Sequence, residues 1–273
     1  MITDNLKSQH GREELKGYFR NGVIPTEKHF EFLIDSTINK LDDGFSKDEN
    51  SGYILTPLGS SSRLITFYKN MDRLEPLFYL EKDEQQSPSL RFVSGLKNPD
   101  AHQDDNELAK DDKSIFFHQN GNIGIGSRCE ENHKLEVNGF LATKGRLGTF
   151  ASGTVPANGK WHDVIKSLDN CQAFEVMARA GIKRTGKFSM LHAIALNAFG
   201  ESTSKINKTR SYFGFFWNRL NIKWEGSTHD YALKLKSCRN FGKNAVIHYR
   251  ITKLWDDELF TTDQSFYAPG ETH

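Results

Sequence analysis

The sequence NGNIGIGS at residues 120–127, followed by KLEVNG at residues 134–139, decides the fold expected for this chain. Its apolar residues alternate with small or polar ones, as in β-strands that bury one face. Glycine allows positive φ angles and close backbone approach. We therefore predict a glycine-rich neck formed by Gly121, Ile123, Gly124, Ile125, Gly126, Leu135, Val137 and Gly139.

A nucleotide-binding loop is the alternative interpretation of these glycines. A dinucleotide fingerprint requires G-x-G-x-x-G between a strand and a helix, whereas this chain has the reverse order, G-x-x-G-x-G. Residues 127–133 begin no amphipathic helix, so no helix N-terminus is offered to a phosphate. A Walker-type Gly-Lys-Ser/Thr sequence is also absent from the chain. We therefore expect no cofactor.

The neck sequence resembles the GNVGIGT…KLEVNG element of bacteriophage tail fibres and of fibres in phage-tail-like contractile injection particles. Residues 15–44 resemble N-terminal modules of fibre-like proteins from Bacteroidetes-type bacteria. Residues 148–165, 171–181 and 249–258 resemble a head domain that recurs behind the glycine element. This resemblance implies a homotrimeric structural protein rather than an enzyme, with the residues of the neck at the trimer axis, where glycine lets three chains approach closely. It also implies a fibre that attaches to, or assembles with, other macromolecules.

Two short helices are predicted at the N-terminus. The first covers Gly11–Arg20 and is stopped by Asn21-Gly22. The second starts at Pro25-Thr26-Glu27 and ends before Asp42-Asp43-Gly44. It carries an apolar stripe of Phe30, Leu33, Ile34, Thr37, Ile38 and Leu41. Because a short helix is marginally stable alone, the stripe should pack on the first helix or on symmetry mates. We expect residues 1–45 to attach the protein to other particle proteins.

Alternating residues and turn signals predict a mainly β chain after these helices. Residues 46–113 form a β-rich shoulder, and its loop 98–113 has six acidic and two basic residues and no glycine. That loop is expected to be a solvated insertion rather than a calcium site. Shoulder strands are predicted at Tyr53–Leu58, Arg63–Lys69, Leu77–Lys82 and Ser89–Ser94.

The neck takes residues 114–150, the head residues 151–260 and a tail residues 261–273. Short strands and the lack of long helices predict an antiparallel β-sandwich for the head. The predicted head strands are His162–Ile165, Ala173–Ala180, Phe188–Leu196, Ser211–Trp217, Leu220–Trp224, Tyr231–Ser237 and Val246–Lys253.

Charge is unevenly distributed along the chain, although the formal net charge is +1. Residues 179–253 carry 15 Lys/Arg and 3 Asp/Glu, a net charge of +12. Residues 1–178 carry 21 basic and 27 acidic side chains, a net charge of −6, and the last twenty residues add five acidic ones. A basic C-terminal part favours an acidic partner, such as an acidic cell-surface glycan.

Aromatic residues interleaved with basic ones mark a candidate receptor-binding site in the head. Exposed rings stack on sugars, and flanking Arg or Lys side chains hold acidic groups. The predicted strand Ser211–Trp217 would divide these rings between two faces, one of which belongs to the core. No DNA or RNA motif accompanies them, so nucleic acid is not expected. The candidate receptor-binding residues are Tyr212, Phe216, Trp217, Arg219, Lys223 and Trp224.

Other classes of site find little support in the sequence. Cys129, Cys171 and Cys238 are widely spaced and odd in number, which predicts neither a disulfide framework nor a zinc site. The scattered histidines form no H-E-x-x-H, and there is no G-x-S-x-G nucleophile elbow. We therefore assign no catalytic residue and no metal ligand.

Localisation follows from the absence of membrane signals. No run approaches the roughly 18 apolar residues that span a bilayer. Residues 1–20 lack the apolar core of a signal peptide. We expect no membrane insertion, assembly in the cytoplasm, and a place in a virion-like or extracellular particle after release.

Together these patterns predict a homotrimeric, adhesin-like fibre component of a phage-tail-like contractile injection particle, which mediates attachment or assembly. Two alternatives stay open. One is a cap or cage component of such a particle without receptor binding. The other is a carbohydrate-active enzyme, which is disfavoured because no paired carboxylates stand out in the sequence.

Overall fold

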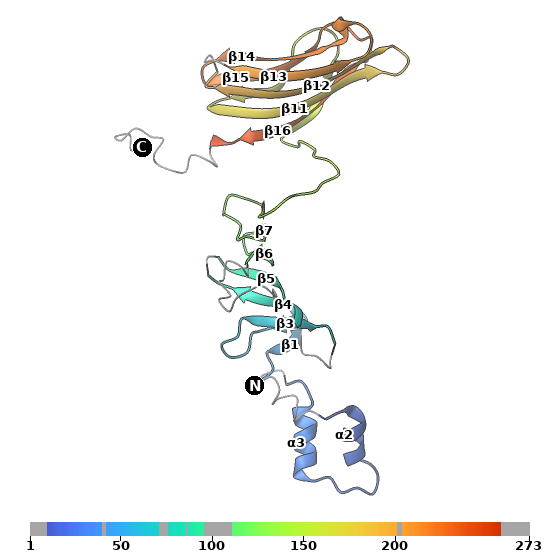
Figure 1. The fold of residues 1–273 in the computed structure, drawn as a ribbon, viewed down its shortest axis with the longest axis vertical. Coiled ribbons are helices and arrows are strands. Elements are labelled where there is room, and N and C mark those ends of the chain that lie inside the picture. Colours follow the sequence, from blue (N-terminus) through green and yellow to red (C-terminus); the bar gives the residue numbers. More distant parts are fainter. Residues whose placement is uncertain are drawn as a thin grey trace, which may run out of the picture. The chain divides into compact units, whose positions relative to one another are not determined.

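The computed structural model describes residues 10–39, 42–70, 76–85, 87–95, 111–200 and 204–257. The chain divides into two compact units, residues 1–141 and 142–273. Among the described residues, strands predominate and the α-helices are two short ones, which confirms the predicted mainly β class (Figure 1). The predicted tail, residues 261–273, and residues 98–110 of the acidic loop lie outside the described residues.

The helices of the first unit are α2 (Arg12–Tyr18) and α3 (Glu27–Asp35). They meet through aromatic rings, with Tyr18 stacked on His29 at a centroid distance of 4.4 Å. Neither helix buries a residue, and Ile34 of the predicted stripe is 65 % exposed. The pair therefore leaves most of its apolar stripe uncovered within the chain.

The second helix is shorter than the predicted one, because the backbone finds other partners after Asp35. The Thr37 hydroxyl donates a hydrogen bond to the Ile34 carbonyl at 2.9 Å, and the Asn39 N–H donates to the Asp43 carboxylate at 2.6 Å. Such local bonds compete with helix continuation. A two-stranded hairpin follows, β1 (Phe45–Asp48) with β2 (Gly52–Leu55), of which the sequence had predicted only the second strand.

A six-stranded sheet in the order β3-β4-β5-β6-β7-β8 forms the rest of the first unit (Figure 1). The predicted shoulder and the glycine-rich element therefore share one sheet. All neighbours pair antiparallel except β7 and β8, which are parallel. The strands are β3 (Arg63–Tyr68), β4 (Pro76–Asp83), β5 (Ser89–Ser94), β6 (Ser114–His118), β7 (Ile123–Ile125) and β8 (Leu135–Val137).

One face of this sheet is apolar and open. Cross-strand partners lie on the same face, and the registers place Phe67 opposite Phe78, Phe117 opposite Ile123, and Ile125 opposite Val137. Phe117 is 46 % exposed and Ile125 is 40 % exposed. We call this group the open apolar face: Ile65, Phe67, Phe78, Leu80, Leu90, Phe92, Ile115, Phe117, Ile123, Ile125, Leu135 and Val137.

The opposite face of the sheet is buried and carries charges. Arg91 Nη2 lies 2.6 Å from Asp111 Oδ1, and Arg91 Nη1 lies 3.4 Å from Glu81 Oε1. Arg128 bridges Asp83 at 2.8 Å and Asp111 at 3.0 Å. Asp111 belongs to the loop that was predicted to be solvated, and for this residue the prediction is wrong because its carboxylate closes the buried network.

The ring of Phe116 lies at the centre of this ion network. It is fully buried, and the guanidinium groups of Arg91 and Arg128 lie 5.0 and 5.2 Å from its centroid. Buried charges are tolerated only when they are paired and hydrogen-bonded, and Arg91 Nε also donates to the Ser114 hydroxyl at 3.0 Å. The sheet thus places charge inside the chain and apolar side chains outside, the reverse of a soluble monomer.

The network makes the stability of the first unit depend on pH. Burial raises the pKa of Asp83, but hydrogen bonds from Arg128 and from the Gln85 N–H, together with the charges of Arg128 and Arg91, outweigh burial and hold this pKa below its ordinary value. A carboxyl group with a lowered folded-state pKa stabilises the fold above its unfolded pKa, and this contribution is lost as the pH falls through the folded value. We expect the free energy of unfolding to decrease below about pH 4, the unfolded pKa of Asp. Urea unfolding from pH 7 to pH 2 measures this free energy. If an Asp83→Asn variant lost stability as steeply with falling pH as the unchanged protein, Asp83 would not be the source of the pH dependence.

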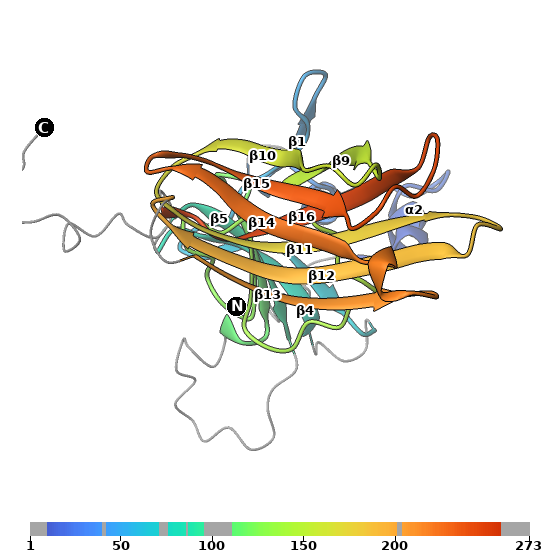
Figure 2. The same cartoon turned by 90° about the horizontal axis from the view of Figure 1, so that it is seen from above.

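The second unit contains two packed antiparallel sheets (Figure 2). One has five strands in the order β13-β12-β11-β16-β9, and the other has three in the order β10-β15-β14. The strands are β9 (Ala151–Pro156), β10 (His162–Leu168), β11 (Cys171–Ile182), β12 (Lys187–Ala198), β13 (Lys205–Tyr212), β14 (Leu220–Ser227), β15 (Asp230–Ser237) and β16 (Val246–Trp255).

One apolar core joins the two sheets. Phe174 and Leu191 of the five-stranded sheet pack with Leu220 and Leu233 of the three-stranded sheet, and each is fully buried. Alternating strand residues supply this core, as expected for sheets that each bury one face. The Phe150 ring stacks on Phe174 at a centroid distance of 5.4 Å, so residues before β9 also contact the core.

One predicted head strand, Ser211–Trp217, is wrong. The observed strand β13 begins earlier and ends at Tyr212, and a 3₁₀ helix η1 (Phe216–Asn218) follows. Gly214 has φ +80°, which breaks the extended conformation between them. Strand β9 was not predicted, because its glycine, serine and proline residues hide the strand pattern.

Candidate functional site

The four apolar residues predicted at the trimer axis lie together in the structure. Ile123 pairs with Leu135, and Ile125 pairs with Val137, so all four share the open apolar face. What the sequence analysis missed is the extent of this face, which continues through β6, β5 and β4 to Phe67 on β3. The alternation of apolar and polar residues in those strands indicated one apolar face per strand. The sequence did not show which strands pair, or in which register, so the faces could not be joined into one surface.

Steric and conformational requirements within a single chain explain three glycines of the glycine-rich element. A Cβ at Gly124 would lie 2.1 Å from the Ser127 carbonyl oxygen, so no side chain fits there. Gly121 and Gly126 adopt φ +81° and +72°, which place the tight turn before β7 and the reversal after it. Gly139 follows β8 and is exposed. Gly121, Gly124 and Gly126 thus shape this edge of the sheet within one chain, and their place at a trimer axis stays a prediction.

Asn122 fixes the segment that covers the buried face, a role that the sequence analysis missed. It is 1 % exposed, and its side-chain NH₂ donates to the carbonyls of Glu130 and Glu131 at 3.3 and 2.9 Å. Its Oδ1 accepts a hydrogen bond from Lys134 Nζ at 2.8 Å. This anchoring holds the segment that carries Arg128 over the sheet.

The candidate receptor-binding residues are only partly brought together. Residues 212–217 form an exposed turn at the end of β13, which we call the aromatic loop. Phe213, Phe215 and Phe216 are 66 %, 65 % and 57 % exposed. The Arg219 guanidinium lies 5.4 Å from the Phe216 ring centroid and 6.0 Å from that of Tyr212. The Trp217 ring packs between Phe215 and Phe216, at 4.8 and 4.7 Å.

Asn218 positions the aromatic loop. It is buried, and its side-chain NH₂ donates to the Phe213 carbonyl at 2.7 Å and to the Gly186 carbonyl at 3.4 Å. Gly186 belongs to the turn between β11 and β12, which also carries the exposed Lys183 and Arg184. The loop therefore lies beside a basic turn on the same unit.

Lys223 and Trp224 lie apart from the aromatic loop. Trp224 is partly buried against the core, with its ring 5.6 Å from that of Tyr231. Lys223 lies 4.8 Å from the Trp161 ring centroid and is hydrogen-bonded to Glu225. The hydrogen bonds from Lys223 and Lys234 lower the pKa of Glu225 to about 2. Part of the basic surface on the three-stranded sheet is thus neutralised locally.

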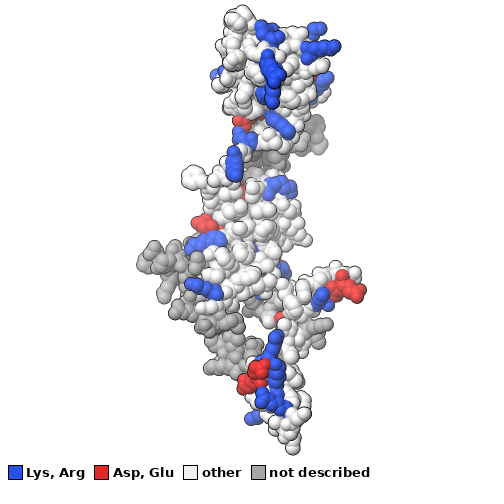
Figure 3. All heavy atoms as spheres, turned by 90° about the vertical axis from the view of Figure 1, so that its right-hand side faces the viewer, with Lys and Arg blue, Asp and Glu red and all other residues white. Residues whose placement is uncertain are grey.

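Basic side chains still predominate on the second unit. In the upper part of Figure 3, the visible charged residues are mostly Lys and Arg. The described residues contain no group of three or more His, Cys, Asp or Glu side chains placed to hold a metal ion. None of the helices in the described part of the chain is long and apolar enough to cross a membrane.

The arrangement offers two surfaces for binding. The first is the open apolar face of the six-stranded sheet, and the second is the aromatic loop with its basic neighbours. Comparison of the chain with protein-family models, with curated proteins and with solved structures found no match.

Proposed function

We propose that this chain is a structural fibre component of a phage-tail-like contractile injection particle, assembled as a homotrimer. Its second unit acts as a β-sandwich head that attaches the particle to an acidic or glycan-bearing surface. The observation that carries the proposal is the six-stranded sheet with its charges buried and its apolar face open.

The size of the open apolar face favours burial against other chains. Taking roughly 200 Å² for a fully exposed large apolar side chain, the exposed fractions of this group amount to on the order of 600 Å². That is the upper end of the largest apolar patch on a typical monomer, about 300–600 Å². It also approaches the roughly 800 Å² that one protein contributes to a standard interface.

The chemistry of the face fits a second and third copy of the same chain. The face consists of Phe, Ile, Leu and Val side chains, except for Ser94 opposite Phe78 and Lys82 opposite Leu90, so identical copies meet there with little like-charge repulsion. The one charged residue that pairs with it, Lys82, lies at its rim and is bound to Glu84 at 2.5 Å. Three such sheets facing one axis form a closed cyclic assembly, in which each sheet buries its apolar side.

Light scattering on the purified full chain tests the assembly. The expected mass is three times the 31.1 kDa of the chain, unchanged on dilution through the micromolar range. A monodisperse monomer under these conditions would refute the proposed trimer.

The aromatic loop supports the attachment role. Replacing Phe215 and Phe216 by Ser is expected to leave the melting temperature nearly unchanged, because both rings are more than half exposed. The same variant should lose most binding to target cells or to a glycan array, because the ring faces that stack on sugars are removed. As a matched control, Leu220→Ser changes a fully buried residue and should lower stability instead. Unchanged binding by the loop variant would exclude the loop as an attachment site.

A further inference from the structure

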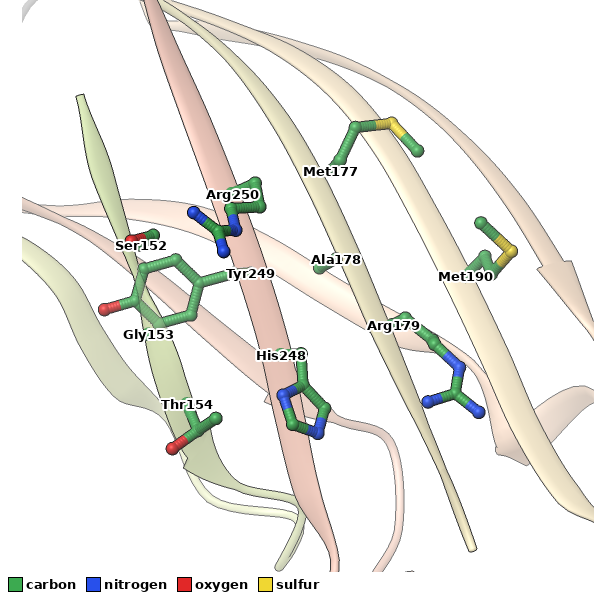
Figure 4. Close-up of a pocket in the computed structure, with 10 residues that line it drawn as sticks. All are labelled: Ser152, Gly153, Thr154, Met177, Ala178, Arg179, Met190, His248, Tyr249 and Arg250. Carbon is green, nitrogen blue, oxygen red and sulfur yellow. The ribbon is translucent and has the colours of Figure 1, made fainter. Parts of the chain in front are cut away.

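A shallow hollow lies on the outer face of the five-stranded sheet in the second unit. Its volume is about 390 Å³, within the range of ligand pockets. Strands β9, β11, β12 and β16 supply its lining, and the side chains that matter here are Met177, Arg179, Met190, His248 and Arg250 (Figure 4). None of these residues was singled out by the sequence analysis.

The strand registers place the basic side chains of the hollow next to one another. Arg179 of β11 is directly opposite His248 of β16, and Met177 is directly opposite Arg250. All four therefore share the face that points away from the core, and all four are exposed. Because neighbouring strands are hydrogen-bonded over their length, the sheet holds these side chains on a rigid base.

The two arginines are available to a ligand. Within the described part of the chain, neither guanidinium makes a hydrogen bond or ion pair, and no Asp or Glu lines the hollow. The nearest acidic residue along β11, Glu175, is already bound by Arg146 and by His192, the latter at 2.9 Å. The hollow is therefore a concentration of uncompensated positive charge.

The remaining lining suits a ligand that is more than a simple ion. The thioether side chains of Met177 and Met190 provide an adaptable apolar surface. Ser152 and Thr154 of β9 lie opposite Arg250 and His248 and supply hydroxyl groups that both donate and accept hydrogen bonds. Guanidinium groups match the planar oxygens of carboxylate or sulfate groups in a bidentate manner.

We propose that this hollow binds an acidic saccharide, with the carboxylate or sulfate of the sugar held by Arg179 and Arg250. The ring carbons lie against Met177 and Met190, and the sugar hydroxyls bond to Ser152 and Thr154. The inference deepens the attachment role and rests on it for its biological meaning. The second unit would then have two attachment sites, the hollow on the five-stranded sheet and the aromatic loop at the end of β13.

Calorimetric titration of the full chain with defined oligosaccharides tests the site. The probes are hexagalacturonate for carboxylate, a heparin-derived hexasaccharide for sulfate, neutral maltohexaose, and hexaglutamate for an acidic peptide. We expect binding of an anionic hexasaccharide that weakens with salt and is at least tenfold tighter than that of maltohexaose. Loss of charge-assisted hydrogen bonds in the Arg179→Gln, Arg250→Gln double variant should weaken it about tenfold or more.

A matched control separates the site from general positive charge. Lys160→Gln with Lys243→Gln also removes two exposed charges from the same unit, outside the hollow and outside the aromatic loop and its basic turn, and affinity should change less than about twofold. Equal losses in both double variants, no binding of either anionic hexasaccharide, or tighter arginine-dependent binding of hexaglutamate would each overturn the proposal. Light scattering of the same samples gives their oligomeric state, so the proposed trimer and the proposed saccharide site are tested separately. A monomer that binds refutes the trimer, whereas a trimer that does not bind refutes the site.

Discussion

Replacing Ile125 by Asp is expected to convert the trimer into monomers or to prevent its assembly altogether. In a single chain Ile125 is 40 % exposed, so a carboxylate is tolerated there at little cost. In the proposed trimer, three carboxylates meet in an apolar interior, where each unpaired charge costs several kcal/mol. Light scattering and a dilution series of the variant measure this effect directly.

The control for this variant is Asn120→Asp. Asn120 is exposed in the turn before β7, and its side-chain oxygen accepts a hydrogen bond from the Asn122 N–H at 3.0 Å, which Asp can replace. The same charge is added within five residues of Ile125 but off the open apolar face, so the trimer should persist. If Ile125→Asp stays trimeric with an unchanged melting point, the face is not at the axis.

Arg91→Ala is expected to destabilise the first unit by about 3–5 kcal/mol, because it leaves the buried Glu81 and Asp111 carboxylates without one of their cations. A loss of this size lowers the melting temperature by on the order of 10 °C. Differential scanning calorimetry should show the effect in one transition, because the two units have separate cores.

Removing both partners tests whether the penalty comes from unpaired charge. The Arg91→Met, Glu81→Leu double variant deletes one pair and keeps Arg128 bound to Asp83 and Asp111. We expect it to recover much of the lost stability, since well-packed apolar residues often replace a buried ion pair at little cost. A double variant as unstable as Arg91→Ala would show that packing of the Arg91 side chain, rather than its charge, stabilises the sheet.

Local sequence signals accounted for much of the secondary structure, and their failures have identifiable causes. The Ser89–Ser94 strand was predicted to the residue, because both its faces alternate regularly. The strand Ser211–Trp217 was wrong because aromatic residues favour strands in general, while Gly214 and the hydrogen bonds of Asn218 impose a turn here. The strand preference of the aromatic residues is therefore overridden here by one buried side chain, Asn218, which binds two backbone carbonyls.

The candidate site was less accessible from the sequence, because its residues come together only through strand pairing. Arg179 is far from His248 and Arg250 in the chain but is their neighbour in the sheet. Arg179 and Arg250 become a candidate binding site because the structure shows no acidic partner for either of them among the described residues. Lys223, by contrast, was a candidate from the sequence, yet its hydrogen bond to Glu225 compensates its charge.

Sequence patterns alone predicted the mainly β class, the two N-terminal helices, the alternating apolar residues of the neck and the basic character of the second unit. These follow from periodicity, turn residues and composition, which are local properties. Which side of the six-stranded sheet is covered depends instead on the tertiary structure. Strand β5 alternates Leu90 and Phe92 with Arg91, so its sequence allows either face to be the inner one. The charged face can be buried only if residues from other segments of the chain pair with its charged side chains. Here Asp111 and Arg128, brought from other segments, provide this pairing, so the charged face turns inward and the apolar face stays exposed within the chain.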